Sequence, residues 1–239
     1  MASSTILIIF LLFGVSAIFT NAYLLALDQN AKMKKSGQLP DIPALVIAGL
    51  KFLAMAPVAT TGLLLAIHYS SPYAWLIVAG LAVCLAADMA IMANFIAGLA
   101  VFLTGHAVYI FAFNAGKHSF MGPDPAPLML YAVIGAIVYL LLWPRLNTMM
   151  KFAVAAYVIT IVIMAWQALV RFQCFGNPLM LLAVVGAILF MASDSVLAMK
   201  TFQPQHRISA WLKLERTGEP ILMGTYIAAQ WLICLSILA

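Results

Sequence analysis

Charged residues are scarce in this chain, and their scarcity excludes most soluble folds. Only 8% of the 239 residues are Asp, Glu, Lys or Arg, while 66% are hydrophobic. A soluble globular domain is about 45–50% apolar and about 25% charged. The mean hydropathy is +1.09. The composition therefore indicates an integral membrane protein.

Cysteine and histidine are also few, which argues against several kinds of site. The three cysteines, Cys84, Cys174 and Cys234, are scattered and form neither a disulfide framework nor a metal-binding pattern. A metal site needs three or four convergent ligands, and among the four histidines only His106 lies deep in an apolar run. The Gly-x-Ser-x-Gly elbow of many serine hydrolases is missing. We therefore expect no metal and no serine nucleophile.

What the chain does contain is a series of apolar runs, each long enough to cross the hydrocarbon core in about 17–25 residues. They lie near residues 5–27, 42–67, 73–92, 95–114, 126–143, 151–170, 177–198 and 219–238. Residues that favour turns separate the runs. The sequence predicts an all-α polytopic membrane protein, a bundle of eight transmembrane helices forming a single domain over 1–239. We expect 73–92 and 95–114 to be a tight antiparallel pair, and the basic loop 199–218, with Trp211, to lie at the membrane interface.

The basic residues predict the orientation of the bundle. The odd-numbered loops contain nine of them: Lys32, Lys34, Lys35, Arg145, Lys151, Lys200, Arg207, Lys213 and Arg216. The even-numbered loops contain only Lys117 and Arg171, and Lys51 lies inside the second run. The positive-inside rule then places the odd loops in the cytoplasm and both termini outside. The net charge of +5 is a topology signal and predicts no nucleic-acid partner. Compactness favours a bacterial plasma membrane, although a eukaryotic endomembrane is equally compatible.

Two aspartates lie deep in apolar runs, in matching settings. Asp88 ends the segment Gly80-Leu-Ala-Val-Cys-Leu-Ala-Ala-Asp88, and Asp194 ends Gly186-Ala-Ile-Leu-Phe-Met-Ala-Ser-Asp194. A carboxylate at the centre of a membrane helix costs roughly 2.5–3.5 kcal/mol on insertion scales, so such residues commonly have a function. The shared pattern also indicates a parallel internal repeat of four helices, as some transporters have.

Other polar residues share the depth of these acids and are candidates for the same cavity. They are Asn21, Lys51, His106, Tyr109, Ser193, Tyr226 and Gln230. We expect the cavity to open towards the cytoplasmic leaflet. A structural interpretation is also open: an aspartate paired with Lys51 would act as a polar clamp, and the other groups would hydrogen-bond between helices. Two acids against one lysine still leave one carboxylate over. A retinal-type Schiff base at Lys51 is disfavoured because the lysine lies in an early helix.

Several segments together resemble the YhhN-type lysoplasmalogenase family. They are Gly80-Leu…Ala87-Asp88, Gly98-Leu-Ala-Val-Phe-Leu-Thr-Gly-His106-Ala-Val-Tyr109, Gly186…Ser193-Asp194-Ser-Val-Leu-Ala and Gly224-Thr-Tyr226-Ile-Ala-Ala-Gln230-Trp. Lys51 matches a lysine that the family carries in its second helix. Two positions depart from the family pattern: Ala87 stands where Gly is usual, and Phe52 where Pro is frequent. These departures bear on cavity shape and substrate range.

The resemblance implies an eight-helix hydrolase that cleaves the vinyl ether of lysoplasmalogens into a fatty aldehyde and a glycerophospho-ethanolamine or -choline. Vinyl ethers hydrolyse through protonation at carbon, and a carboxylic acid can deliver that proton. A second carboxylate can stabilise the resulting cation, as paired acids do in glycoside hydrolysis. Asp88 and Asp194 would divide these roles. Lys51 would contact the lipid phosphate or hold one aspartate ionised, and no cofactor is expected.

Other functions stay open on the sequence alone. A proton-coupled transporter or a lipid-binding protein would also use buried acids, although no broken helices occur at matched positions. A seven-helix receptor with an extra helix is a further alternative. A family member acting on a different ether or ester lysolipid is another. In each lipid-related case the expected partners are a lysophospholipid and membrane lipids.

Overall fold

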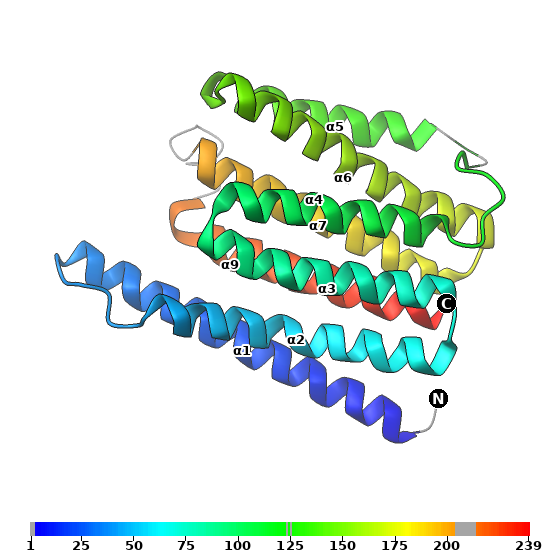
Figure 1. Cartoon of the computed structure of the whole chain (residues 1–239), viewed down its shortest axis with the longest axis horizontal. Helices are drawn as coiled ribbons and strands as arrows, with labels where there is room; N and C mark the ends of the chain where they lie inside the picture. Colours follow the sequence, from blue (N-terminus) through cyan, green and yellow to red (C-terminus); the bar gives the residue numbers. More distant parts are fainter. Residues whose placement is uncertain (1–2, 123, 125, 204–213) are drawn as a thin grey trace.

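The computed structural model describes residues 3–122, 124, 126–203 and 214–239, and it is an all-helical bundle (Figure 1). The long helices are α1 (Ser3–Lys35), α2 (Ala44–Tyr69), α3 (Pro72–Ala93), α4 (Phe95–Asn114), α5 (Ala126–Leu142), α6 (Thr148–Phe175), α7 (Leu181–Phe202) and α9 (Leu214–Leu235). Within these residues, eight helical segments are long and apolar enough to cross a membrane. The predicted fold class and number of spans are confirmed.

The first helix is longer than predicted. It continues to Lys35, although the apolar run ends near residue 27. Asp28 and Lys32 form an ion pair of 2.6 Å one turn apart, and the last turn holds three lysines. Both features stabilise a helix whose C-terminal end carries negative partial charge. At 1.5 Å per residue, such a helix is longer than the ~30 Å hydrocarbon core, so α1 extends beyond it.

The predicted tight pair of α3 and α4 is present, and a single residue joins the two helices. The extended backbone of Asn94 ends α3, and its side-chain oxygen accepts a hydrogen bond of 3.0 Å from the backbone N–H of Ala97, which caps α4. Just beyond this turn, a Cβ added to Gly98 would lie 2.4 Å from the Cα of Ile91. Glycine at this position therefore allows the two backbones to approach closely.

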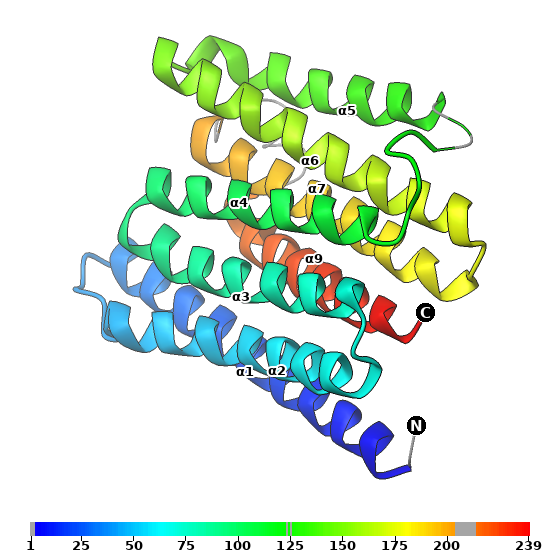
Figure 2. The ribbon, with the colours of Figure 1, turned by 45° about the vertical axis from the view of Figure 1, so that its right-hand side comes forward.

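The packing of the helices follows the predicted four-helix repeat (Figures 1 and 2). In the first half, α1 packs on α2, α2 on α3, and α3 most extensively on α4; in the second half, α5, α6, α7 and α9 pack in the same order. The halves meet through α4 with α6 and through α2 with α9. These are equivalent contacts, because exchanging the two halves turns one into the other.

The glycines of the two matching segments lie at close helix contacts. A Cβ on Gly80 would lie 2.3 Å from the ring of Tyr109 in α4. A Cβ on Gly186 would lie 2.9 Å from the carbonyl oxygen of Ala229 in α9. Because glycine has no side chain, each of these helices, which carry the two aspartates, can pack closely against its neighbour.

The segment that joins α7 to α9 is shorter than the loop expected over residues 199–218. The helix α7 continues to Phe202, and α9 starts at Leu214. The expectation for Trp211 falls outside the described residues. The termini of the chain lie on the same side of the bundle, as an even number of spans requires (Figure 1).

Candidate active site between the two halves

Asp88 in α3 is buried and fully paired. Its Oδ1 lies 2.9 Å from Nζ of Lys51 in α2, and its Oδ2 accepts a hydrogen bond of 2.6 Å from the hydroxyl of Tyr226 in α9. The side chain of Asp88 is only 1% exposed and that of Lys51 only 10%. A buried carboxylate needs such compensation, since removing one partner of a buried ion pair leaves an uncompensated charge. The cation of Lys51 and the hydroxyl of Tyr226 both favour the charged form of Asp88, whereas burial opposes it.

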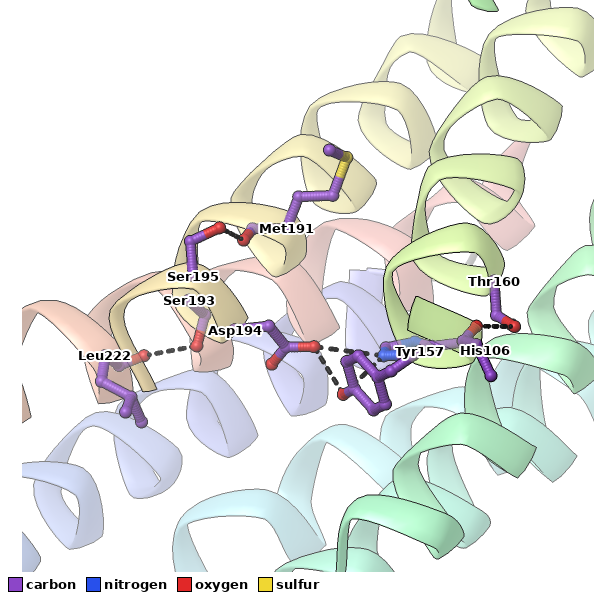
Figure 3. Close-up of polar contacts among 9 residues, drawn as sticks. His106, Tyr157, Thr160, Met191, Ser193, Asp194, Ser195 and Leu222 are labelled. Atoms are coloured by element: carbon purple, nitrogen blue, oxygen red, sulfur yellow. Dashed lines mark hydrogen bonds and ion pairs between the residues drawn. The ribbon is translucent and has the colours of Figure 1, made fainter. Parts of the chain in front are cut away.

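Asp194 in α7 has different partners, shown in Figure 3. Its Oδ2 accepts a hydrogen bond of 2.6 Å from the hydroxyl of Tyr157 in α6 and lies 3.2 Å from Nε2 of His106 in α4. The same Nε2 lies 2.9 Å from the Tyr157 hydroxyl. The three groups form a closed triangle without a lysine or arginine. The side chain of Asp194 is 14% exposed, so it remains reachable from the cavity described next.

The ring of His106 contributes a further constraint. Its Nδ1 is buried and has no hydrogen-bond partner among the described residues, while Nε2 faces Asp194 and Tyr157. A neutral imidazole carries one proton, and the acceptors lie on the Nε2 side. We therefore assign the proton to Nε2, which lets His106 donate towards the carboxylate of Asp194.

Both carboxylates face one polar cavity of about 230 Å³ between the two halves. Its walls include Tyr23, Lys51, Asp88, Phe102, Ser193, Asp194, Glu219, Leu222 and Tyr226. The side chain of Glu219 is 41% exposed and pairs with Lys200. The shared cavity expected for the two acids is therefore present, with Glu219 as its most exposed acidic side chain.

The other sequence candidates divide into three groups. Ser193 lines the cavity, and its hydroxyl donates a hydrogen bond of 3.1 Å to the carbonyl oxygen of Leu222, which ties α7 to α9. Tyr109 donates a bond of 2.7 Å to Gln230, joining α4 to α9, but neither residue is among those that line the cavity.

Asn21 does not join the site. Its side chain is exposed and donates a hydrogen bond of 2.9 Å to the carbonyl oxygen of Ala17, one turn earlier in α1. An amide that hydrogen-bonds to its own helix backbone pairs one of its N–H groups there and does not need a partner on another helix. The prediction that Asn21 lines the cavity is therefore wrong, because its side chain is on the other side of the helix.

Three residues that the sequence analysis missed belong to the site. Tyr157 binds Asp194, while Tyr23 and Glu219 line the cavity. A signal for Tyr157 was present: it is a tyrosine in the apolar sixth helix, which is the repeat equivalent of the helix that carries Lys51. The described residues contain no group of three His, Cys, Asp or Glu side chains that could hold a metal ion.

This fold and this site define a polytopic helical membrane protein with a pair of buried acids at the junction of two four-helix halves. The chain matches the YhhN family over residues 44–237 and belongs to that family. No solved structure matches it.

Curated relatives of this chain are named lysoplasmalogenases. The chain is 34% identical over 148 residues to human lysoplasmalogenase TMEM86B, a match that covers 61% of this chain and 55% of the relative. It is 30% identical over 151 residues to bovine lysoplasmalogenase TMEM86A, covering 59% and 55%. The rat lysoplasmalogenase TMEM86B is 31% identical over 172 residues, covering 70% and 63%. The chain thus spans just over half the length of the first two relatives.

Proposed function

We propose that this protein is a lysoplasmalogenase-type hydrolase, which cleaves the vinyl ether of a lysophospholipid by acid–base catalysis with Asp88 and Asp194. The observation that carries the proposal is that both carboxylates face one cavity but have unlike partners. Paired acids with different environments are the arrangement that acid–base enzymes use. The names of the relatives support the substrate class.

The partners favour Asp194 as the proton donor and Asp88 as the carboxylate. The cation of Lys51 and the hydroxyl of Tyr226 both favour the charged form of Asp88. Among the residues that the structure describes, no lysine or arginine pairs with Asp194, which is also the more exposed of the two acids. In this proposal the acid proton of Asp194 is on Oδ1, because Oδ2 already accepts hydrogen bonds from Tyr157 and His106. Asp194 can transfer that proton into the cavity, while Asp88 keeps its negative charge.

The reaction then balances without a cofactor. Asp194 protonates the vinyl carbon remote from the ether oxygen, which leaves an oxocarbenium ion and an Asp194 carboxylate. Asp88 stabilises this cation across the cavity by its charge. Water adds to the cationic carbon and loses a proton, and the hemiacetal collapses to a fatty aldehyde and the glycerol hydroxyl. The released proton restores Asp194.

Lys51 acts in this scheme by holding Asp88 ionised. Its Nζ lies 2.9 Å from Oδ1 of Asp88, and the side chain is nearly buried. This distance supports the ion-pair role over a direct contact with the lipid phosphate. Glu219 lines the same cavity and is more exposed, but it is already paired with Lys200.

The test is aldehyde release from a synthetic lysoplasmalogen by the purified protein in detergent. Asp88→Asn and Asp194→Asn should each lower kcat at least about 100-fold, the lower range of a general acid's contribution. Both variants must elute as the wild type does in size-exclusion chromatography. Full activity of either variant would overturn the two-acid mechanism. No turnover by well-folded wild type, with proton-coupled uptake in vesicles, would favour transport.

A further inference from the structure

A second cavity lies on the other side of α7 and differs in character from the polar one. It is a narrow groove between α4, α5, α6 and α7, lined mostly by aliphatic and aromatic side chains. Along α7 its lining runs from Met191 to Phe202, and α5 contributes the stretch from Ile134 to Leu142. Ile134 is 42% exposed, so the groove reaches the outer surface of the bundle, which faces lipid in a membrane.

The groove and the polar cavity meet at Asp194. Three residues line both: Phe95 at the start of α4, and Asp194 and Leu197 in α7. Asp88, Lys51 and Glu219 line only the polar cavity. Asp194 is therefore the carboxylate that lies where the apolar groove meets the polar cavity.

We propose that the groove binds the hydrocarbon chain of a lysolipid, while the glycerophosphate end of the same molecule occupies the polar cavity. The inference rests on the proposed function, which supplies a ligand with one long chain and one polar end. In such a lipid, the vinyl ether joins the chain to the glycerol. It therefore lies where the polar and apolar parts meet, and this arrangement puts it beside Asp194.

The length of the groove suits an extended chain, and its volume of about 60 Å³ encloses a short part of one, so most of the chain would lie along its open side. Phe202 follows Met191 by eleven positions along α7, which is about 16.5 Å of helix at 1.5 Å per residue. That is roughly half the ~30 Å hydrocarbon core. The remainder of a long chain can leave through the open side of the groove without crossing a polar surface. Burying methylene groups in the groove also supplies binding energy that orients the ether bond.

The first experiment locates the chain directly by photo-crosslinking. The probe is a lysophosphatidylethanolamine with an ester-linked chain that carries a diazirine, so it binds without containing a vinyl ether. After illumination of the purified protein, mass spectrometry should find adducts in residues 134–142, 154–161 and 191–202. Adducts spread evenly over the lipid-facing surface of α1 would overturn the proposal.

The second experiment fills the groove with matched substitutions. Ala198 lines the groove and Ala192 is an exposed residue of the same helix outside it. Ala198→Phe should reduce crosslinking and raise KM several-fold for long-chain substrate but little for a short-chain analogue. Ala192→Phe should change neither. Equal effects of the two substitutions would contradict the proposal.

A second pair of substitutions, in α5, tests the proposal if the Ala198 variant does not fold. Val138 of α5 lines the groove, whereas Val133 of the same helix is 55% exposed and lies outside it. Val138→Trp should reproduce the chain-length effect, and Val133→Trp should not. Crosslinking in the groove without aldehyde release by wild type would overturn the proposed function alone. Aldehyde release with adducts elsewhere would overturn the groove alone.

Discussion

Asp88 and Asp194 take their partners from equivalent helices of the two halves. Asp88 in the third span binds Lys51 of the second and Tyr226 of the eighth, and Asp194 in the seventh binds Tyr157 of the sixth and His106 of the fourth. Advancing each helix by four positions converts one set into the other. The scaffold is thus repeated, while the side chains differ. Asp88 has a tyrosine and a lysine as partners, and Asp194 has a tyrosine and a histidine.

We first predict that Lys51→Met destabilises the protein. The substitution leaves Asp88 buried without its cation, and breaking a buried pair costs about 3–5 kcal/mol. The melting temperature in detergent should fall by several degrees. The double variant Lys51→Met with Asp88→Asn should be more stable than Lys51→Met alone but remain inactive.

The control for Lys51 is the exposed pair Asp28–Lys32, whose side chains are 58% and 74% exposed. Lys32→Met should cost no more than about 1 kcal/mol, because solvent screens surface pairs. Equal melting temperatures for the two lysine variants would show that the charge of Asp88 does not need Lys51.

We next predict that Tyr157 positions Asp194. Tyr157→Phe removes the hydrogen bond of 2.6 Å to the carboxylate. Because the proposed acid form of Asp194 is neutral, this hydrogen bond should contribute about 0.5–1.5 kcal/mol, so kcat should fall about 2- to 10-fold. The pH dependence of kcat should also change, which a purely structural role would not cause.

Tyr139→Phe is the matched control for Tyr157→Phe. The hydroxyl of Tyr139 donates a hydrogen bond of 3.2 Å to the carbonyl oxygen of Lys151 and not to either aspartate. Its loss should leave kcat and the pH profile unchanged. The same pH profile for wild type and Tyr157→Phe would exclude the positioning role.

The predicted orientation can be tested through a native thiol. Cys174 is exposed near the end of α6, on the side predicted to be outside, while Cys84 and Cys234 are buried. In intact cells, a membrane-impermeant maleimide should label this protein at Cys174, and Cys174→Ser should abolish labelling of the protein. In that variant background, Ser36→Cys should become labelled only after the cells are lysed. Labelling of residue 36 in intact cells would reverse the topology.

A pH-dependent stability is expected from Lys117, which follows α4 outside the spans. Its Nζ donates a hydrogen bond of 2.5 Å to Gln167. Burial, with a smaller contribution from nearby Arg171, lowers the pKa of Lys117 from 10.5 to about 8, against an opposing effect of Cys174. Between these two values the unfolded chain binds more protons than the folded protein, so stability should rise with pH.

The measurement for Lys117 is the melting temperature as a function of pH. Wild type should gain stability relative to Lys117→Met between about pH 8 and 10.5, the window given by the folded and ordinary pKa values. Below pH 8 the difference should be constant. Parallel curves across the whole range would contradict burial of the ammonium group.

The proposal that Asp194 lies where polar and apolar cavities join gives the two acids unequal access to substrate. Asp88 lines only the polar cavity, whereas Asp194 lines both. Shortening the hydrocarbon chain of the substrate should therefore alter the position of the vinyl ether relative to Asp194 more than relative to Asp88. This asymmetry has no counterpart in the two sequence segments, which are nearly alike.

The sequence by itself determined the class of protein and the number of spans. Long apolar runs must become helices in a bilayer, because every backbone polar group has to be satisfied internally. Counting residues along spans of fixed rise also predicts which polar groups have similar heights. For these reasons, Asp88, Asp194 and Lys51 could be predicted as one set, and the eight spans are confirmed.

Only the tertiary structure decided which side of each helix faces the site. An apolar helix in lipid has no polar face to reveal its rotation, so Asn21 was placed in the cavity although it faces outward, and Tyr157 was overlooked. The partner of each acid also depends on contacts between spans far apart in sequence, such as Tyr226 with Asp88. Helix rotation and packing between the halves, which no local pattern encodes, thus made the two similar aspartates different.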